Sequence, residues 1–234
     1  MSAQPIQTVL FDLDGTFADT APDLAHALNQ TLLAHQKPEL TLEQIRPVVS
    51  NGGKALIELG FNLPESDPKF EALRLELLEF YKQDIATHTL LFNGIKRLIE
   101  QLPANGINWG IVTNKPSWLT DPLMQALGLA EQACSIVSGD TLPQRKPDPE
   151  PLLYAAKQCG SAPEACLYIG DAERDIVAGK RAGMHTMVAL YGYIESFSQP
   201  DEWQADIYIN EVSEIMEWVL KINDTAPMST KHAN

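Results

Sequence analysis

Two aspartates stand at the end of an apolar run near the N-terminus, in the stretch VLFDLDGTFADT at residues 9–20. Asp12 and Asp14 lie two residues apart, so on an extended backbone both side chains point to the same side. Two carboxylates held side by side repel each other, and the arrangement needs either a shared proton or a cation. The stretch therefore predicts a site in which a proton or a metal ion balances the two acids.

Polar residues also follow three later predicted strands: TNK at 113–115, RKPDP at 145–149 and GDAERD at 170–175. Ligands of open parallel sheets bind beyond the carboxyl ends of the strands, so these segments should gather with Asp12 and Asp14 at one edge. Each segment alone has an ordinary explanation as a turn acid, a helix-capping residue or a solvated charge. Four such segments at one sheet edge favour a functional site.

Phosphoryl transfer suits this set of side chains. A carboxylate can attack phosphorus and form an aspartyl-phosphate, and Asp12, which ends the strand, is the predicted nucleophile. Mg²⁺ prefers oxygen ligands, which Asp12, Asp171 and the backbone carbonyl of Asp14 would provide. The Asp14 side chain would protonate the leaving alkoxide and later deprotonate the attacking water. We therefore expect a Mg²⁺-dependent phosphomonoesterase that acts on a small phosphorylated metabolite.

Further residues at the same edge are predicted to hold the phosphoryl group. Lys146 would balance the charge on the nucleophile and on the phosphoryl oxygens. Thr113 would donate a hydrogen bond to these oxygens, together with backbone N–H groups around Leu13 and Asn114. The predicted site thus combines acids, one lysine and several hydrogen-bond donors.

The elements that must position these residues alternate between strands and helices over most of the chain. Apolar runs predict strands at residues 7–11, 107–113, 134–139, 165–170, 185–190 and 206–209. Helical spacing predicts helices between them at residues 95–102, 116–127, 148–160, 173–183 and 212–220. This alternation indicates an α/β fold with a doubly wound, mostly parallel, Rossmann-like sheet and helices on both faces.

An all-helical block interrupts the alternation after the first strand. We expect an α/β core of residues 1–17 and 88–224, an inserted helical cap of residues 18–87 and a flexible tail of residues 225–234. The chain would cross between core and cap twice, near residues 17–19 and 85–89, and these crossings would act as hinges.

Capping residues indicate where several helices begin. Thr20 with Asp23 and Thr41 with Gln44 each resemble a capping box, in which two side chains bind backbone N–H groups reciprocally. Asp148 is predicted to cap the helix that starts with a proline at the next position.

The composition excludes several classes of protein. The formal net charge is −14 without any cluster of lysine and arginine, which argues against a nucleic-acid partner. No apolar stretch approaches membrane-spanning length, and the start MSAQPIQT lacks the features of a signal peptide, so we expect a cytoplasmic protein without membrane contact. Cys134, Cys159 and Cys166 are odd in number and are expected to be buried, reduced thiols. The oligomeric state is left open.

The chain resembles the haloacid dehalogenase superfamily in four separate segments. FDLDGT (11–16), IVTNK (111–115), KPDP (146–149) and GDAERD (170–175) match the four motifs of that family, in the same order. The resemblance implies a core sheet of the family's type, and the inserted helical block looks like the cap of its phosphatase branch.

The resemblance also implies roles for individual residues: nucleophile Asp12, acid/base Asp14, phosphate-binding Thr113, Lys146 and metal-site Asp171. Asp175 matches the second acid of the fourth motif, which supports the metal through water or a neighbouring residue. Dehalogenases lack an acid two residues after the nucleophile, because their leaving halide needs no proton. Asp14 therefore favours a phosphatase or a phosphomutase, and a non-catalytic sensor of phosphorylated ligands is a further alternative.

The substrate is less well indicated than the reaction. The whole chain is similar to phosphoglycolate phosphatase-like proteins, while FEALRLELLEFY, WGIVTNKP and YGYI also resemble a branch that dephosphorylates N-acetylmuramic acid 6-phosphate. Both substrates carry a carboxylate and a phosphomonoester. A Gly-Gly turn into a helix would present N–H groups to such a carboxylate, although it could equally be a simple helix–helix turn. The predicted specificity loop consists of Ser50, Asn51, Gly52, Gly53 and Lys54.

Overall fold

A six-stranded parallel sheet forms the centre of the computed structural model, which describes residues 4–195 and 198–225. The strand order is β5-β4-β1-β6-β7-β8, so the first strand lies between strands that come much later in the chain. The strands are β1 (Thr8–Phe11), β4 (Asn108–Val112), β5 (Ile136–Val137), β6 (Cys166–Gly170), β7 (His185–Ala189) and β8 (Ile207–Ile209). The predicted α/β fold with a mostly parallel sheet is confirmed.

The strand register explains why the predicted segments meet. Phe11, the last residue of β1, pairs with Ile111 of β4 on one side and with Ile169 of β6 on the other. Asp12 and the residues that follow Ile111 and Ile169 therefore leave the sheet at the same edge. Strand pairing in the parallel sheet thus brings together the segments after β1 and β6, which are more than 150 positions apart in the sequence.

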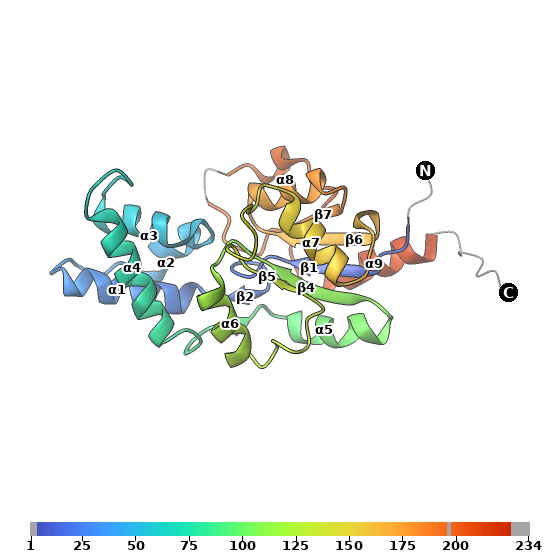
Figure 1. The fold of residues 1–234 in the computed structure, drawn as a ribbon, viewed down its shortest axis with the longest axis horizontal. Helices are drawn as coiled ribbons and strands as arrows, with labels where there is room; N and C mark the ends of the chain where they lie inside the picture. Colours follow the sequence, from blue (N-terminus) through green and yellow to red (C-terminus); the bar gives the residue numbers. More distant parts are fainter. Residues whose placement is uncertain (1–3, 196–197, 226–234) are drawn as a thin grey trace.

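Helices cover both faces of the sheet (Figure 1). Val9 and Phe11 of β1 belong to a cluster with α5 (Ile95–Ala104), α6 (Ser117–Ala126) and α9 (Ser213–Thr225). Leu10, which points the opposite way, packs with α7 (Glu150–Gln158) and α8 (Glu173–Arg181). This alternation of side chains along one buried strand produces the three-layer arrangement.

Four helices form a separate lobe at one end of the sheet, on the left in Figure 1. We call α1 to α4 the helical lobe; the helices are α1 (Ala21–Ala34), α2 (Leu42–Ile45), α3 (Gly52–Phe61) and α4 (Phe70–Gln83). Leu28, Leu56 and Leu77 are fully buried in a hydrophobic cluster that consists mainly of lobe residues. The helical lobe therefore has a core of its own, within the segment for which a cap was predicted.

The two chain passages between the sheet and the helical lobe lie side by side. β2 (Ala18–Asp19) and β3 (Leu90–Leu91) pair in the antiparallel direction and form a two-stranded ribbon. Asp19 binds the Arg46 guanidinium of the lobe at 2.7 Å through Oδ2 and accepts a hydrogen bond from the Tyr193 hydroxyl, also at 2.7 Å, through Oδ1. Asp19 thus links the ribbon, the helical lobe and the core.

One of the two predicted capping boxes is wrong. Thr20 occupies the capping position of α1 but makes no capping hydrogen bond, because its hydroxyl donates to Asp14 at 2.6 Å. Asp23 instead accepts hydrogen bonds from the backbone N–H and the hydroxyl of Thr89. Distant partners have displaced the local pattern at both positions.

The other helix starts follow the predictions more closely. Thr41 and Gln44 form the predicted capping box at the start of α2. α7 begins at Glu150, one residue later than expected, with Pro149 at the capping position. Asp148 still accepts a hydrogen bond from the Glu150 backbone N–H at 2.9 Å, so it satisfies a free donor of the first turn.

The prediction of three reduced thiols is wrong for two of the cysteines. Cys134, which precedes β5, and Cys159, at the end of α7, form a disulfide with a Cα–Cα distance of 5.2 Å. Both cysteines are bound to β4. The backbone carbonyl of Trp109 accepts a hydrogen bond from the backbone N–H of Cys134, and the Asn108 side chain donates one to the backbone carbonyl of Cys159. Cys166 is a buried free cysteine as expected, and burial raises its pKa to about 12.

Two further expectations concern the chain end and membranes. Thr225 is the last residue of α9, so the first residue of the predicted tail is helical, and residues 226–234 lie outside the described part of the chain. Within residues 4–195 and 198–225, no helix has the length and apolar character needed to cross a membrane.

Candidate active site

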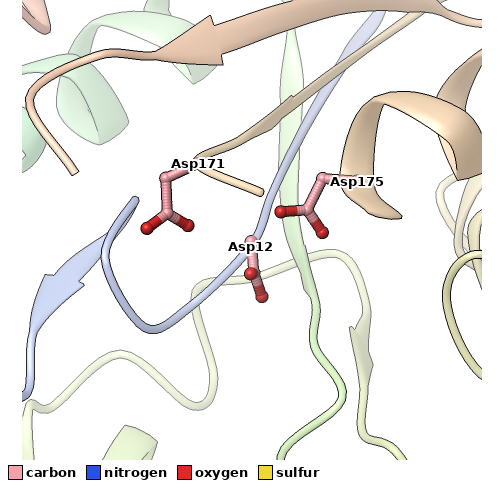
Figure 2. A group of neighbouring side chains, drawn as sticks. All are labelled: Asp12, Asp171 and Asp175. Atoms are coloured by element: carbon pink, nitrogen blue, oxygen red, sulfur yellow. The ribbon is translucent and has the colours of Figure 1, made fainter. Parts of the chain in front are cut away.

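Three aspartates converge at the carboxyl edge of the sheet (Figure 2). Asp12 follows β1, Asp171 follows β6 and Asp175 lies in the first turn of α8. All three are buried, and one carboxylate oxygen from each lies within 4.8 Å of the others. Gly15 makes this approach possible, because a Cβ at this position, where φ is +84°, would collide with the Asp171 carboxylate.

Lys146 supplies the counter-charge inside this acidic cluster. Its Nζ lies 2.9 Å from Asp12 Oδ1 and 2.8 Å from Asp175 Oδ1. The same ammonium donates to the Tyr168 hydroxyl at 2.8 Å, and that hydroxyl donates to the backbone carbonyl of Val112. One lysine therefore neutralises only part of the negative charge of three buried carboxylates.

The uncompensated negative charge affects the pKa values of Asp171 and Asp12. Burial raises the pKa of Asp171 to about 7, and the nearby charges of Asp12 and Asp175 add to this effect. Burial also raises the pKa of Asp12, although Lys146 opposes the change. The raised pKa values mean that the ionised carboxylates are unfavourable in this site, and a bound cation would stabilise them.

The acidic cluster fits a hard divalent cation. All three side chains offer carboxylate oxygens, the donor type that such ions prefer. Within the part of the chain that the structure describes, Asp175 Oδ1 is buried without an aligned hydrogen bond, despite its close approach to Lys146. An oxygen of this kind can still accept a metal ligand bond, and Asp12, Asp171 and Asp175 are therefore the residues that could hold a metal ion.

Asp14 lies outside this cluster and has its own partners. Its Oδ1 accepts a hydrogen bond from the Thr20 hydroxyl at 2.6 Å and pairs with Lys115 Nζ at 2.8 Å. Lys115 is buried beside the Tyr81 ring, and although burial opposes its charge, Asp14 and Tyr81 raise its pKa above the usual range. Both partners bind the same carboxylate oxygen, Oδ1.

The predicted phosphate-binding residues lie in different surroundings. Thr113 and Asn114 line a cavity between the core and the helical lobe, which is described below. Leu13 is fully buried, and its backbone N–H donates to Asp12 Oδ1 at 2.8 Å. The Asn114 side chain binds both backbone groups of Lys146, accepting from its N–H and donating to its carbonyl. The structure therefore places Asn114 where it holds the loop that carries the lysine.

A cavity of about 530 Å³ lies between the core and the helical lobe. Its walls include Asp12 and Asp14 from the core and Trp118 at the start of α6. The predicted specificity loop also lines it: Ser50, Asn51, Gly52, Gly53 and Lys54. A volume of this size is in the usual range for small-molecule sites.

The loop also contacts the acidic cluster directly. The Ser50 hydroxyl donates to Asp171 Oδ2 at 2.7 Å, and the Tyr193 backbone N–H donates to the same oxygen at 2.9 Å. Arg174, next to Asp175 on α8, donates to the Ser50 carbonyl and to Asn51 Oδ1. In place of a simple loop, residues 46–51 form a short 3₁₀ helix that leads directly into α3.

Comparison with known proteins identifies the group to which this site belongs. A family model described as haloacid dehalogenase-like hydrolase matches residues 9–189, which is more than half of the chain and includes all four predicted motifs. The chain belongs to the haloacid dehalogenase-like hydrolase family. Its resemblance to that family in sequence is thus confirmed.

Two sets of sequence relatives of this hydrolase carry different names. A protein named phosphoglycolate phosphatase from Xanthomonas campestris pv. campestris is 41% identical over 211 residues, which cover 90% of this chain and 95% of the relative. A protein named N-acetylmuramic acid 6-phosphate phosphatase from Pseudomonas putida is 42% identical over 212 residues, covering 90% and 94%. Both names are those of phosphatases, and the predicted enzyme class, a phosphoric monoester hydrolase, is confirmed.

Solved structures support the same family fold. A predicted phosphoglycolate phosphatase from Haemophilus somnus matches with a TM-score of 0.80 at 25% identity, over 91% of this chain and 97% of that one. CbbY from Rhodobacter sphaeroides, solved in complex with phosphate, matches with a TM-score of 0.72 at 25% identity, over 90% and 96%. The sheet and the helical lobe of this hydrolase therefore lie within a shared architecture.

The sequence interpretation missed several residues that contact the site of this hydrolase. Lys115 and Thr20 hold Asp14, and Arg174 joins the core to the helical lobe. Lys115 lies in the TNK segment, two residues after Thr113, so the sequence already indicated that it lies near the site. Thr20 and Arg174 gave no comparable signal, because their partners lie in parts of the fold that only the structure places.

Proposed function

We propose that this hydrolase is a Mg²⁺-dependent phosphomonoesterase that forms an aspartyl-phosphate on Asp12. The observation that carries the proposal is the buried cluster of Asp12, Asp171 and Asp175. A single lysine supplies too little positive charge to balance these three carboxylates. Mg²⁺ would bind these carboxylates and offset the repulsion between nucleophile and phosphate. The backbone carbonyl of Asp14 is the further oxygen ligand that we propose.

Asp12 would attack phosphorus through a carboxylate oxygen, and the bond between phosphorus and the ester oxygen would break. Asp14 would give the leaving alkoxide a proton from Oδ2, while Thr20 and Lys115 hold Oδ1. A water molecule would then lose a proton to Asp14 and attack the phosphorus of the aspartyl-phosphate. This step releases inorganic phosphate and restores the Asp12 carboxylate.

Lys146, Thr113 and the backbone N–H groups near Leu13 and Asn114 would stabilise the phosphoryl oxygens. Lys146 Nζ is held by Asp12, Asp175 and Tyr168, so its position is set before the substrate arrives. Preorganised donors of this kind lower the barrier because they need no rearrangement during the reaction.

The helical lobe would act as a cap over this chemistry. Its loop from Ser50 to Lys54 lines the cavity opposite the core residues, which supports a role in substrate choice. The first substrate candidate is 2-phosphoglycolate, which would give glycolate and phosphate, since relatives of that name match most of the chain. We propose the boundaries 1–17 and 88–224 for the core and 18–87 for the cap.

N-acetylmuramic acid 6-phosphate is the second candidate. The cavity of about 530 Å³ is much larger than a two-carbon acid needs, and the partly exposed Trp118 ring in its wall could pack against a sugar. This size favours the sugar phosphate, while the names of the relatives include both substrates.

A phosphate-release assay tests the proposal. The purified protein with Mg²⁺ should hydrolyse 4-nitrophenyl phosphate and at least one of the two candidate substrates, and Asp12→Asn should abolish turnover. A side-by-side comparison of kcat/KM would identify the preferred substrate. Failure of the wild-type protein to release phosphate from all three compounds would refute the phosphatase and favour a non-catalytic sensor, whereas interconversion of sugar phosphates would indicate a mutase.

A further inference from the structure

Arg174 occupies a distinctive place between the catalytic cavity and the helical lobe. It lies in the first turn of α8, next to Asp175, and it lines the cavity. Its guanidinium donates to Asn51 Oδ1 at 3.1 Å and to the Ser50 backbone carbonyl. A half-buried core side chain is therefore held by neutral oxygens of the loop that was predicted to contact the substrate.

The other cationic side chains in the cavity wall are already occupied or lie at its exposed rim. Three of them have carboxylate partners within the protein: Lys54 with Glu65, Arg74 with Glu71, and Lys115 with Asp14. Arg145 is exposed at the surface. Among the residues that the structure describes, Arg174 is the cation that lies partly buried in this wall and forms no ion pair within 4.0 Å.

Arg174 carries a positive charge, because a guanidinium is not deprotonated in proteins. Asp175, Asp12 and Asp171 are the acids that act on this charge most strongly. Lys146 pairs with Asp12 and Asp175, and the proposed cation would balance the remaining negative charge of these acids. The positive field of the guanidinium is then available to an anionic group in the cavity.

A guanidinium has five N–H donors in a planar fork, which matches the two oxygens of a carboxylate. The hydrogen bonds to Ser50 and Asn51 occupy one donor on each terminal nitrogen and leave the others available. Asn51 in turn makes no capping bond at the start of α3, although it occupies the capping position, since its oxygen accepts from Arg174. The loop is thus arranged around the arginine.

We propose that Arg174 binds the carboxylate of the substrate and determines the specificity of this hydrolase for phosphate esters that also carry a carboxylate. The inference rests on the proposed phosphatase function and adds a residue and a ligand group to it. It also assigns the two ends of the substrate to different parts of the cavity, with the phosphate at Asp12 and the carboxylate at the boundary between α8 and the loop.

Binding of matched ligands to the Asp12→Asn protein tests the inference without turnover. N-acetylmuramic acid 6-phosphate is paired with N-acetylglucosamine 6-phosphate, which lacks the lactyl carboxylate, and 2-phosphoglycolate is paired with 2-hydroxyethyl phosphate. Calorimetric titration in Mg²⁺ should show, for at least one pair, that the carboxylate ligand binds about tenfold or more tightly than its partner, as expected for one charge-assisted contact.

Adding Arg174→Gln should remove this preference, and Arg174→Lys should keep part of it, because the charge remains without the fork. Arg145→Gln is the matched control, and it should change the preference by less than about twofold, since an exposed charge in water interacts weakly. A KM effect confined to carboxylate substrates is expected when Asp12 is restored.

Three results would overturn the inference: no binding preference in the Asp12→Asn protein, no binding of either carboxylate ligand, or an equal loss for both members of a pair in Arg174→Gln. The last result would mean that the arginine only supports the loop. A preference that depends on Arg174 in a protein whose wild-type form releases no phosphate would instead refute the proposed phosphatase and leave the carboxylate site in place.

Discussion

Replacing Asp171 with asparagine should change how the stability of the metal-free protein depends on pH. Burial raises the pKa of Asp171 to about 7 from an ordinary value of 3.8, with Asp12 and Asp175 adding to the effect. Between pH 4 and 7, the folded protein therefore holds a proton that the unfolded chain has released. Linkage then requires the free energy of unfolding to fall as the pH rises through this range.

The size of the effect follows from the pKa change. A difference from 3.8 to about 7 corresponds to roughly 4 kcal/mol in full, and about 3 kcal/mol of this should appear between pH 5 and pH 8. Asparagine has no charge at any of these pH values and keeps an acceptor for the Tyr193 backbone N–H. Asp171→Asn should therefore be stabilised relative to wild type by about 3 kcal/mol more at pH 8 than at pH 5.

Urea unfolding in the presence of EDTA, followed by circular dichroism at pH 5, 6.5 and 8, measures this difference. Titrating groups that do not interact with Asp171 contribute equally to both proteins and cancel when the two are subtracted. Glu131→Gln, at an exposed position, is the control, and its difference from wild type should be the same at each pH. A difference for Asp171→Asn that stays constant from pH 5 to pH 8, or that changes in the opposite direction, would refute the account of the acidic cluster.

Three further predictions concern the lysines and the cation. Lys146→Met should destabilise the protein by about 3 kcal/mol or more in urea unfolding, because Asp12 and Asp175 would stay buried without their counter-charge; an unchanged midpoint would contradict this. Lys115→Met should reduce turnover of alkyl phosphates about tenfold more than that of 4-nitrophenyl phosphate, because Lys115 holds Asp14 in position to protonate the leaving group. The leaving group of 4-nitrophenyl phosphate needs no such proton. EDTA should remove phosphate release and Mg²⁺ should restore it, and activity that survives thorough chelation would count against a metal site.

The positions of the strand-end residues could be predicted because they depend only on the sequence of strands and helices along the chain. Once the alternation of strands and helices indicates a parallel sheet, the residues after each strand must lie at one edge, whatever the strand order. Asp12, Thr113 and Asp171 needed no knowledge of side-chain packing. The register of Phe11 with Ile111 and Ile169 shows how directly this follows from the backbone.

Other residues depend on contacts that a local pattern does not contain. Thr20 and Asp23 have the spacing of a capping box, but Asp23 binds Thr89, 66 positions later in the chain. Cys134 and Cys159 show no metal-like spacing, and only the pairing of β4 with its neighbours brings them into bonding distance. In each case the partner comes from the tertiary structure.

Arg174 illustrates the same limit within the site. In the sequence it is a basic residue between two acids in the first turn of a helix, a setting typical of solvent-exposed positions. Its contacts with Ser50 and Asn51 arise because the helical lobe places its loop over the start of α8. The residues that hold the lobe against the core are therefore the ones that the sequence shows least clearly.

The ribbon formed by β2 and β3 has a consequence for how such enzymes can diversify. Ala18 pairs with Leu91 and Asp19 with Leu90, so the inserted segment starts and finishes on neighbouring strands, about 5 Å apart. A segment whose ends nearly meet can lengthen, shorten or be exchanged as a unit without altering the order of the sheet. Mutation and recombination can thus revise the helical lobe, and with it the proposed choice of substrate, while the residues at the strand ends stay unchanged.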